Sequence, residues 1–204
     1  MNLVWKGKFK NVEQLKEAEE LPERANKFEE PDSLGWFLLN ASIFIIPIVF
    51  LLFVVVNFKS NINGGVSVIA DKNHMYGVVF ALIAIIPHEL LHAVCFPKGS
   101  RVEVWYSLKN LAAFVYCSDP MTKKRFVFMS FFPNLVLGFI PMIIWIFTPV
   151  KYELLNINLL YFAGLNILSG MGDYLNMYNA IKQVPKNGTV QNSGFNSYWY
   201  HNQK

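Results

Sequence analysis

Four long apolar segments limit what this chain can fold into more than any other feature of its sequence. They cover residues 36–58, 76–96, 126–150 and 154–181. A helix needs about 20 mainly apolar residues to cross the hydrocarbon core of a bilayer, and each segment is long enough. The fourth segment contains several polar residues and is the weakest of the set. The pattern predicts a helical integral membrane protein with about four spans.

The composition and the distribution of charge agree with this prediction. Hydrophobic residues make up 53% of the 204 residues, and charged residues make up only 16%. Average soluble domains carry roughly 25% charged residues. Of the 18 Lys and Arg residues, 15 fall before residue 36, in the loop 97–125 or after residue 181. The positive-inside rule then places both termini and this loop in the cytoplasm.

Four ionisable residues lie inside the predicted spans, at two places. His88, Glu89 and His92 lie in the second span, in the sequence IPHELLHA, and Asp173 lies in the fourth. A charged group at the centre of a bilayer costs about 2.5–3.5 kcal/mol even on lenient scales. Such a group therefore indicates a functional site, and these four require a common explanation.

A metal site explains all four residues. Residues four apart share one face of a helix, so His88 and His92 can bind the same ion, and Glu89 can reach a water beside it. Asp173 is the candidate third ligand, which leaves a fourth position for water. At 1.5 Å per residue, the histidines lie about 6–12 Å and Asp173 about 12 Å inside the cytoplasmic boundary. The structural alternative is a protonated Asp173 that only bonds Asn or Ser neighbours.

This set of residues is typical of zinc proteases. Zn²⁺ lowers the pKa of its water to about 7 and polarises a substrate carbonyl. Glu89 would take the proton of the attacking water and deliver it to the leaving nitrogen. Possible contacts to the substrate or its oxyanion are Asn134, Asn166 and Asn176, and the sequence singles out none of them. Asparagines in membrane helices also bond neighbouring helices, which is the structural alternative for each.

On the residues HELLHA and the later GDYLN, the chain resembles a family of bacterial membrane proteins described as zincin peptidases. The family pattern falls on His88, Glu89, His92 and Gly172-Asp173. The resemblance implies a zinc peptidase of the bacterial cell membrane. The chain is similar more loosely to site-2 proteases, whose later span carries Asn, then Pro, then Asp-Gly. Here the proline is missing and a glycine precedes the Asp, so their substrate-binding Asn is not carried over.

The loop 97–125 contains two β-rich runs, RVEVWYSL and LAAFVYCS, on either side of Lys109-Asn110. This spacing predicts a hairpin. The hairpin directly follows the metal helix, so residues 102–106 could accept an extended substrate by β-augmentation. The structural alternative is a hairpin that only covers the cytoplasmic mouth.

The remaining segments suggest no chemistry of their own. Residues 11–30 are charged and predict a helical arm on the cytoplasmic face. Residues 184–204 are rich in Asn and Gly and predict a loop. Cys95 and Cys117 are expected to be reduced thiols packed in a core. The two histidines outside the spans are not expected to bind the metal.

The sequence thus predicts an all-α integral membrane protein with about four transmembrane helices and a short cytoplasmic β-hairpin after the second. Its expected parts are a cytoplasmic arm at 1–35, a four-span zincin-like domain at 36–181 and a cytoplasmic tail at 182–204. The expected function is a Zn²⁺-dependent metalloprotease acting on membrane or membrane-proximal proteins. The expected partners are this substrate and the lipid bilayer, without nucleic acid, and the oligomeric state stays open. The alternative is a non-catalytic metal-binding scaffold or regulator, although such a site gains nothing from Glu89.

Overall fold

The structure is a computed structural model that describes residues 2–15, 21–30, 34–63, 75–107, 112–194 and 196–201. The chain divides into two units, each assembled from distant parts of the sequence. Unit 1 comprises Met1–Asp32, Ile86–Phe132 and Asn176–Lys204, and unit 2 comprises Ser33–Ile85 and Pro133–Leu175.

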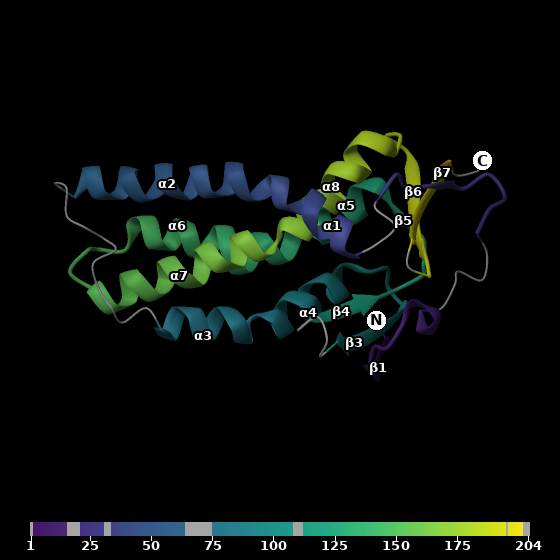
Figure 1. Ribbon diagram of the computed structural model, residues 1–204, viewed down its shortest axis with the longest axis horizontal. Helices are drawn as coiled ribbons and strands as arrows, with labels where there is room; N and C mark the ends of the chain where they lie inside the picture. Colours follow the sequence, from purple (N-terminus) through teal and green to yellow (C-terminus); the bar gives the residue numbers. More distant parts are fainter. Residues whose placement is uncertain are drawn as a thin grey trace. The chain divides into compact units, whose positions relative to one another are not determined.

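Unit 2 is helical. Its elements are α1 (Leu34–Ala41), the 3-10 helix η2 (Ser42–Phe44), α2 (Ile45–Ile62), α3 (Met75–Ile83), the π-helix η3 (Leu135–Phe139), α6 (Ile140–Phe147) and α7 (Glu153–Ser169). Helix α7 contacts α2, α3 and α6, and Figure 1 shows these four helices running side by side. Buried side chains from α2, α6 and α7, among them Ile48, Trp145 and Ile167, form the core between them.

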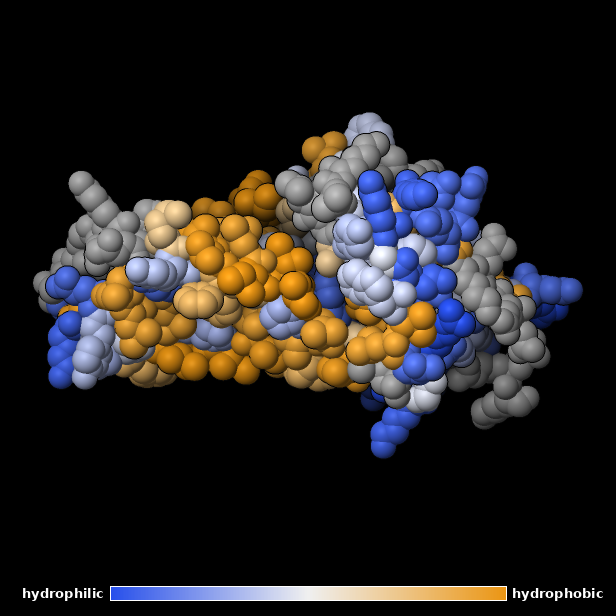
Figure 2. Space-filling view, turned by 90° about the horizontal axis from the view of Figure 1, so that it is seen from below, coloured by the Kyte–Doolittle hydropathy of each residue, from blue (hydrophilic) through white to orange (hydrophobic). Residues whose placement is uncertain are grey.

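The outward surface of unit 2 is apolar. Large hydrophobic side chains such as Ile46 (75% exposed), Phe50 (67%) and Phe147 (79%) point away from the core. Apolar residues cover the helices in the space-filling view of Figure 2. A soluble monomer rarely exposes an apolar surface of this extent, whereas lipid solvates it without cost. The surface of unit 2 therefore suits a bilayer.

Among the residues that the structure describes, three helices are long and apolar enough to cross a membrane, namely Leu39–Ile62, Met75–Cys95 and Lys123–Phe147. They correspond to the first three predicted spans. The fourth predicted span consists of α7 and α8 (Met171–Gln183), which meet at Gly170 with a bend of 43°. The described part of the chain therefore contains three helices that are long and apolar enough to span a membrane, or four if the bent pair forms one span.

Lys59 lies inside α2, beyond the predicted end of the first span, and was missed as an ionisable residue within a helix. Its side chain is fully buried in unit 2. The ammonium group donates to the backbone carbonyl of Trp145 and to Oδ1 of Asn156, and it lies 4.2 Å from the centroid of the Trp145 ring. Neutral acceptors and an aromatic face thus take the place of water around the charge.

Unit 1 contains two sheets. In the first sheet, the central strand β3 (Arg101–Ser107) pairs in parallel with β1 (Asn2–Lys8) and antiparallel with β4 (Ala112–Tyr116). The second sheet is antiparallel, in the order β2 (Asn26–Lys27), β7 (Asn196–His201), β6 (Gly188–Ser193) and β5 (Met121–Thr122). Helices α4 (Ile85–Cys95), α5 (Lys123–Asn134) and the later turns of α8 complete the unit. Their buried side chains, among them Ala93, Met129 and Ala180, belong to one hydrophobic core.

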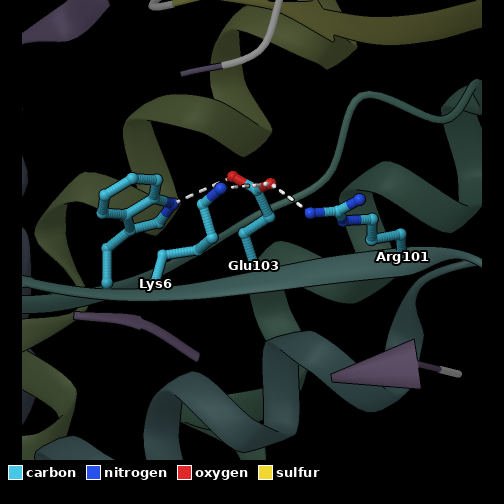
Figure 3. Close-up of polar contacts among 4 residues, drawn as sticks. Lys6, Arg101 and Glu103 are labelled. Atoms are coloured by element: carbon cyan, nitrogen blue, oxygen red, sulfur yellow. Dashed lines mark hydrogen bonds and ion pairs between the residues drawn. The ribbon is translucent and has the colours of Figure 1, made fainter. Parts of the chain in front are cut away.

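A buried carboxylate links β1 to β3. Figure 3 shows Glu103 of β3 between Lys6 and Arg101, at nitrogen–oxygen distances of 3.6 and 3.7 Å. The indole Nε1 of Trp105 also donates to Glu103, at 3.2 Å. Only 5% of Glu103 is exposed, so these donors replace most of the water that an exposed carboxylate would have.

The structure corrects three predictions about secondary structure. The chain is not all-α, because the described strands form the two sheets of unit 1. The predicted helical arm is wrong for the described residues of 11–30, which contain only a 3-10 turn, η1 (Val12–Gln14), and β2. The predicted loop at 184–204 contains the hairpin of β6 and β7. The strands β1 and β2 each pair with a strand far away in the sequence, which no local pattern reveals, whereas β6 and β7 pair with each other in a local hairpin.

The predicted hairpin in the loop 97–125 is confirmed by β3 and β4, although its turn around Lys109-Asn110 lies outside the described residues. However, β3 is the central strand of its sheet. The predicted edge at 102–106 is therefore already paired on both sides, and it cannot accept an additional strand. The sheet instead presents β1 and β4 at its edges.

Candidate metal centre

The two predicted histidine ligands lie one turn apart on α4. Their ring centroids are 4.9 Å apart, so both imidazoles occupy the same face of the helix. His92 is buried and His88 is half-buried. Pro87 lies in the first turn of α4, where its missing N–H costs no helical hydrogen bond. The helix therefore begins just before the two histidines and holds them rigidly.

A backbone carbonyl fixes the orientation of His92. Nδ1 of His92 lies 2.9 Å from the carbonyl oxygen of Met129 on α5. A carbonyl oxygen only accepts hydrogen bonds, so Nδ1 carries the proton and the lone pair of the ring lies on Nε2. Metal-binding histidines commonly donate their second ring nitrogen in this way, which sets both tautomer and ring orientation.

Glu89, the predicted general base, is half-buried beside His88. Its Oε2 accepts a hydrogen bond of 3.1 Å from the backbone N–H of Val115 on β4. This contact ties the carboxylate to the sheet of unit 1. It also shows that the N–H of Val115 points away from β3 and towards the helix that carries the two histidines.

Asp173, the predicted third ligand, lies in the first turn of α8 and is half-buried. Its Oδ2 accepts a hydrogen bond of 2.8 Å from Nδ2 of Asn134, whose side chain is fully buried. The hydroxyl of Tyr174 lies 3.3 Å from Oδ1 of the same asparagine. Asn134 thus orients the carboxylate from one side and is held in place from the other.

Gly170 makes this arrangement possible. A Cβ atom at position 170 would lie 1.8 Å from Oδ1 and 2.4 Å from Cγ of Asn134. The break between α7 and α8 therefore allows the asparagine to pack directly against the backbone. The fourth predicted span is divided between these two helices.

The three predicted asparagine contacts have different surroundings. Asn134 supports Asp173, as described above. Asn166 is buried in α7, and its Nδ2 donates to the carbonyl of Phe162 one turn earlier. Asn176 is half-buried on α8. A contact of any of them with a substrate or an oxyanion remains a prediction.

The two cysteines are buried, as the sequence predicts. Cys95 and Cys117 both belong to the hydrophobic core of unit 1. Burial raises the pKa of the Cys117 thiol above its ordinary value. Of the two histidines outside the spans, His201 is exposed at the end of β7, and His74 lies outside the described residues.

Sequence reasoning missed the two groups that orient the proposed ligands. One is the Met129 carbonyl beside His92, and the other is the side chain of Asn134, which was predicted as a possible substrate contact and not as a partner of Asp173. A signal for the first was present, because Pro133 lies four residues after Met129 in the apolar run FFPNLVLG. A proline inside a helix leaves the carbonyl four residues earlier without its usual donor.

One of three comparisons with known proteins gives a match. No curated protein and no solved structure gives a significant match to this chain. The sequence pattern of one family, described as "putative zincin peptidase", matches residues 81–188, which include the two histidines, Glu89 and Asp173. Because this match covers more than half of the 204 residues, the chain belongs to this family of zincin peptidases.

Proposed function

We propose that this protein is a membrane-embedded zinc metallopeptidase that hydrolyses peptide bonds of membrane or membrane-proximal proteins. The family suggests a metallopeptidase, and the apolar helices suit a membrane. The observation that carries the proposal is the pair of imidazoles on one face of α4, 4.9 Å apart, with one tautomer fixed by a carbonyl.

The donor set fits zinc. Two imidazoles and one carboxylate with an open fourth position are a common ligand set of catalytic zinc sites. In this proposal His88, His92 and Asp173 together bind one metal ion. The hydrogen bond between Nδ1 of His92 and the Met129 carbonyl further favours this assignment, whereas the bond from Asn134 to Asp173 is common to a metal site and to the structural alternative of a protonated carboxyl. Bound there, zinc would supply an activated water nucleophile and polarise the scissile carbonyl.

Packing along α4 and α8 supports the pairing of their ligands. Cys95 and Ala180 belong to the same hydrophobic core. His88 precedes Cys95 by seven residues, and Asp173 precedes Ala180 by seven residues. Seven residues make almost two full turns, so each ligand lies on the same face of its helix as its core residue, about 10.5 Å further along the axis. Each ligand thus lies on the face of its helix that carries the core residue.

Glu89 supplies the acid–base chemistry in this proposal. Its carboxylate takes the proton of the attacking water and passes it to the leaving nitrogen. The hydrogen bond from Val115 keeps the carboxylate beside β4, an edge strand of the first sheet. General acid–base catalysis by a positioned side chain contributes typically 10²–10⁴-fold to the rate. A metal-binding scaffold or regulator would not require this residue.

The test is the zinc content and peptidase activity of the detergent-purified protein, with fluorescein-labelled casein as the probe. We expect one zinc per chain in the wild type, and loss of zinc in both His88→Ala and Asp173→Ala. His201→Ala removes an exposed histidine and serves as the matched control. Glu89→Gln should retain zinc and lose cleavage by about 10²-fold or more.

Each departure from this pattern has a defined meaning. A wild type that binds no zinc, even when the ion is supplied, would refute the proposed function. Zinc lost from His88→Ala but retained by Asp173→Ala would exclude Asp173 as the third ligand. Full activity in Glu89→Gln would refute the role of the base, and zinc binding without any turnover would support the scaffold.

A further inference from the structure

A proline in α5 leaves the carbonyl of Met129 without its ordinary helical partner. In an α-helix the carbonyl of residue i accepts the N–H of residue i+4. For Met129 this position is Pro133, which lies inside the helix and has no N–H. Met129 is buried in the core of unit 1, where water does not replace the missing donor.

Nδ1 of His92 is the group that reaches this carbonyl, at 2.9 Å. A buried carbonyl that accepts no hydrogen bond costs free energy of folding. The hydrogen bond from His92 removes this cost and at the same time orients the imidazole. If residue 133 carried an N–H, the same carbonyl would complete the α-helix, and its hydrogen bond to His92 would be shared or lost.

We propose that Pro133 is a positioning residue for the metal centre. By removing one backbone donor, it reserves the Met129 carbonyl for His92 and holds the imidazole as the Nδ1–H tautomer. The lone pair of the ring then lies on Nε2. The consequence for metal binding rests on the proposed function, whereas the consequence for the tautomer does not.

The next residue of the chain supports the proposed carboxylate ligand. Asn134 donates to Asp173 at 2.8 Å, and the π-helix η3 begins one residue later, at Leu135. Irregular turns of this kind within helices often occur at functional sites. Two adjacent residues therefore position two proposed ligands. Pro133 leaves the Met129 carbonyl available to the imidazole of His92, and the side chain of Asn134 donates to the carboxylate of Asp173.

The test compares Pro133→Ala with Pro141→Ala. Pro141 lies near the start of α6, eight residues further along the chain, and its replacement also restores one N–H. The measurements are the ¹⁵N NMR spectrum of ¹⁵N-histidine-labelled, zinc-free protein, the zinc affinity against a competing chelator, and the melting temperature.

We expect Pro133→Ala to shift His92 towards the Nε2–H tautomer and to weaken zinc binding by about 10–100-fold. Losing the hydrogen bond that orients a metal-binding histidine usually has an effect of this size. The melting temperature of Pro133→Ala should stay at or above that of the wild type, because alanine favours the helix and restores a hydrogen bond. Pro141→Ala should leave both the tautomer and the zinc affinity unchanged. A purely structural proline would instead change stability without changing the tautomer.

Other results would overturn the inference. An Nε2–H tautomer of His92 in the wild type would refute it, and this measurement does not depend on any variant folding. An unchanged tautomer and an unchanged zinc affinity in Pro133→Ala would also refute it, while leaving the zinc site intact. If the wild type binds no zinc, the proposed function fails, but the tautomer comparison still decides the role of Pro133. Pro133→Ser, which also restores the N–H, replaces the alanine variant if that variant does not fold.

Discussion

At the scale of single residues, the candidate centre depends on groups whose side chains bind nothing themselves. Gly170 is the clearest case, because its missing Cβ is what allows Asn134 to approach the backbone and bond Asp173. Since Asn134 is fully buried, it has little room to yield to a larger neighbour. The position of the Asp173 carboxylate thus depends on the absence of a Cβ atom at residue 170.

Gly170→Ala tests this dependence. The new methyl group would displace Asn134, so we expect zinc affinity to fall by about 10-fold or more, and stability to fall by about 1–3 kcal/mol through overpacking. Gly164→Ala in α7 is the matched control, because its Cβ would lie at an ordinary 3.8 Å from Leu52. Chelator competition and thermal unfolding measure the two effects. Equal zinc affinity in both variants would show that Asn134 does not position Asp173.

At the scale of elements, we predict that an extended substrate pairs with the edge strand β4. Val115 pairs with Val104 on one side, and its N–H points to Glu89 on the other. Backbone groups alternate in direction along a strand, so the N–H of Ala113 also points away from β3. A peptide added along this edge would pass beside the proposed base.

Ala113→Pro removes one outward N–H while leaving the inward bonds of β4 in place. We expect the KM for labelled casein to rise by about 5–10-fold, which corresponds to about 1 kcal/mol for one hydrogen bond, with zinc content unchanged. Ala113→Val retains the N–H and controls for the change in side-chain volume. Loss of zinc from the proline variant would instead indicate that β4 only supports the fold.

The sequence predicted those elements whose signal is local. Three apolar spans, the histidine pair and the hairpin of β3 and β4 follow from hydropathy, from spacing along a helix and from β-rich runs. The strands β1 and β2 were missed because their partners lie far away in the sequence, as in the pairings of Asn2 with Arg101 and of Asn26 with Trp199. The burial of Lys59 was missed because it depends on Trp145 and Asn156, which lie far from Lys59 in the sequence.

At the scale of the whole molecule, the distribution of positive charge predicts an orientation of the chain in a membrane. The excess of Lys and Arg before residue 36 and in the loop 97–125 predicts that both lie in the cytoplasm. Asn61 at the end of α2 and Lys98 after α4 are both exposed, so each can be replaced by a reporter cysteine without disturbing a core. The prediction places these two positions on opposite sides of the bilayer.

A membrane-impermeant maleimide applied to intact cells should label Asn61→Cys and should label Lys98→Cys only after the cells are permeabilised. The native thiols give little background, because both are buried and because burial raises the pKa of Cys117, which lowers its thiolate fraction at neutral pH. The wild type should therefore react only after denaturation. Labelling of Lys98→Cys in intact cells would reverse the predicted orientation and would move the proposed peptidase site to the opposite face, since α4 ends three residues before this position. The side on which Lys98 reacts thus decides whether the substrates are cytoplasmic or external.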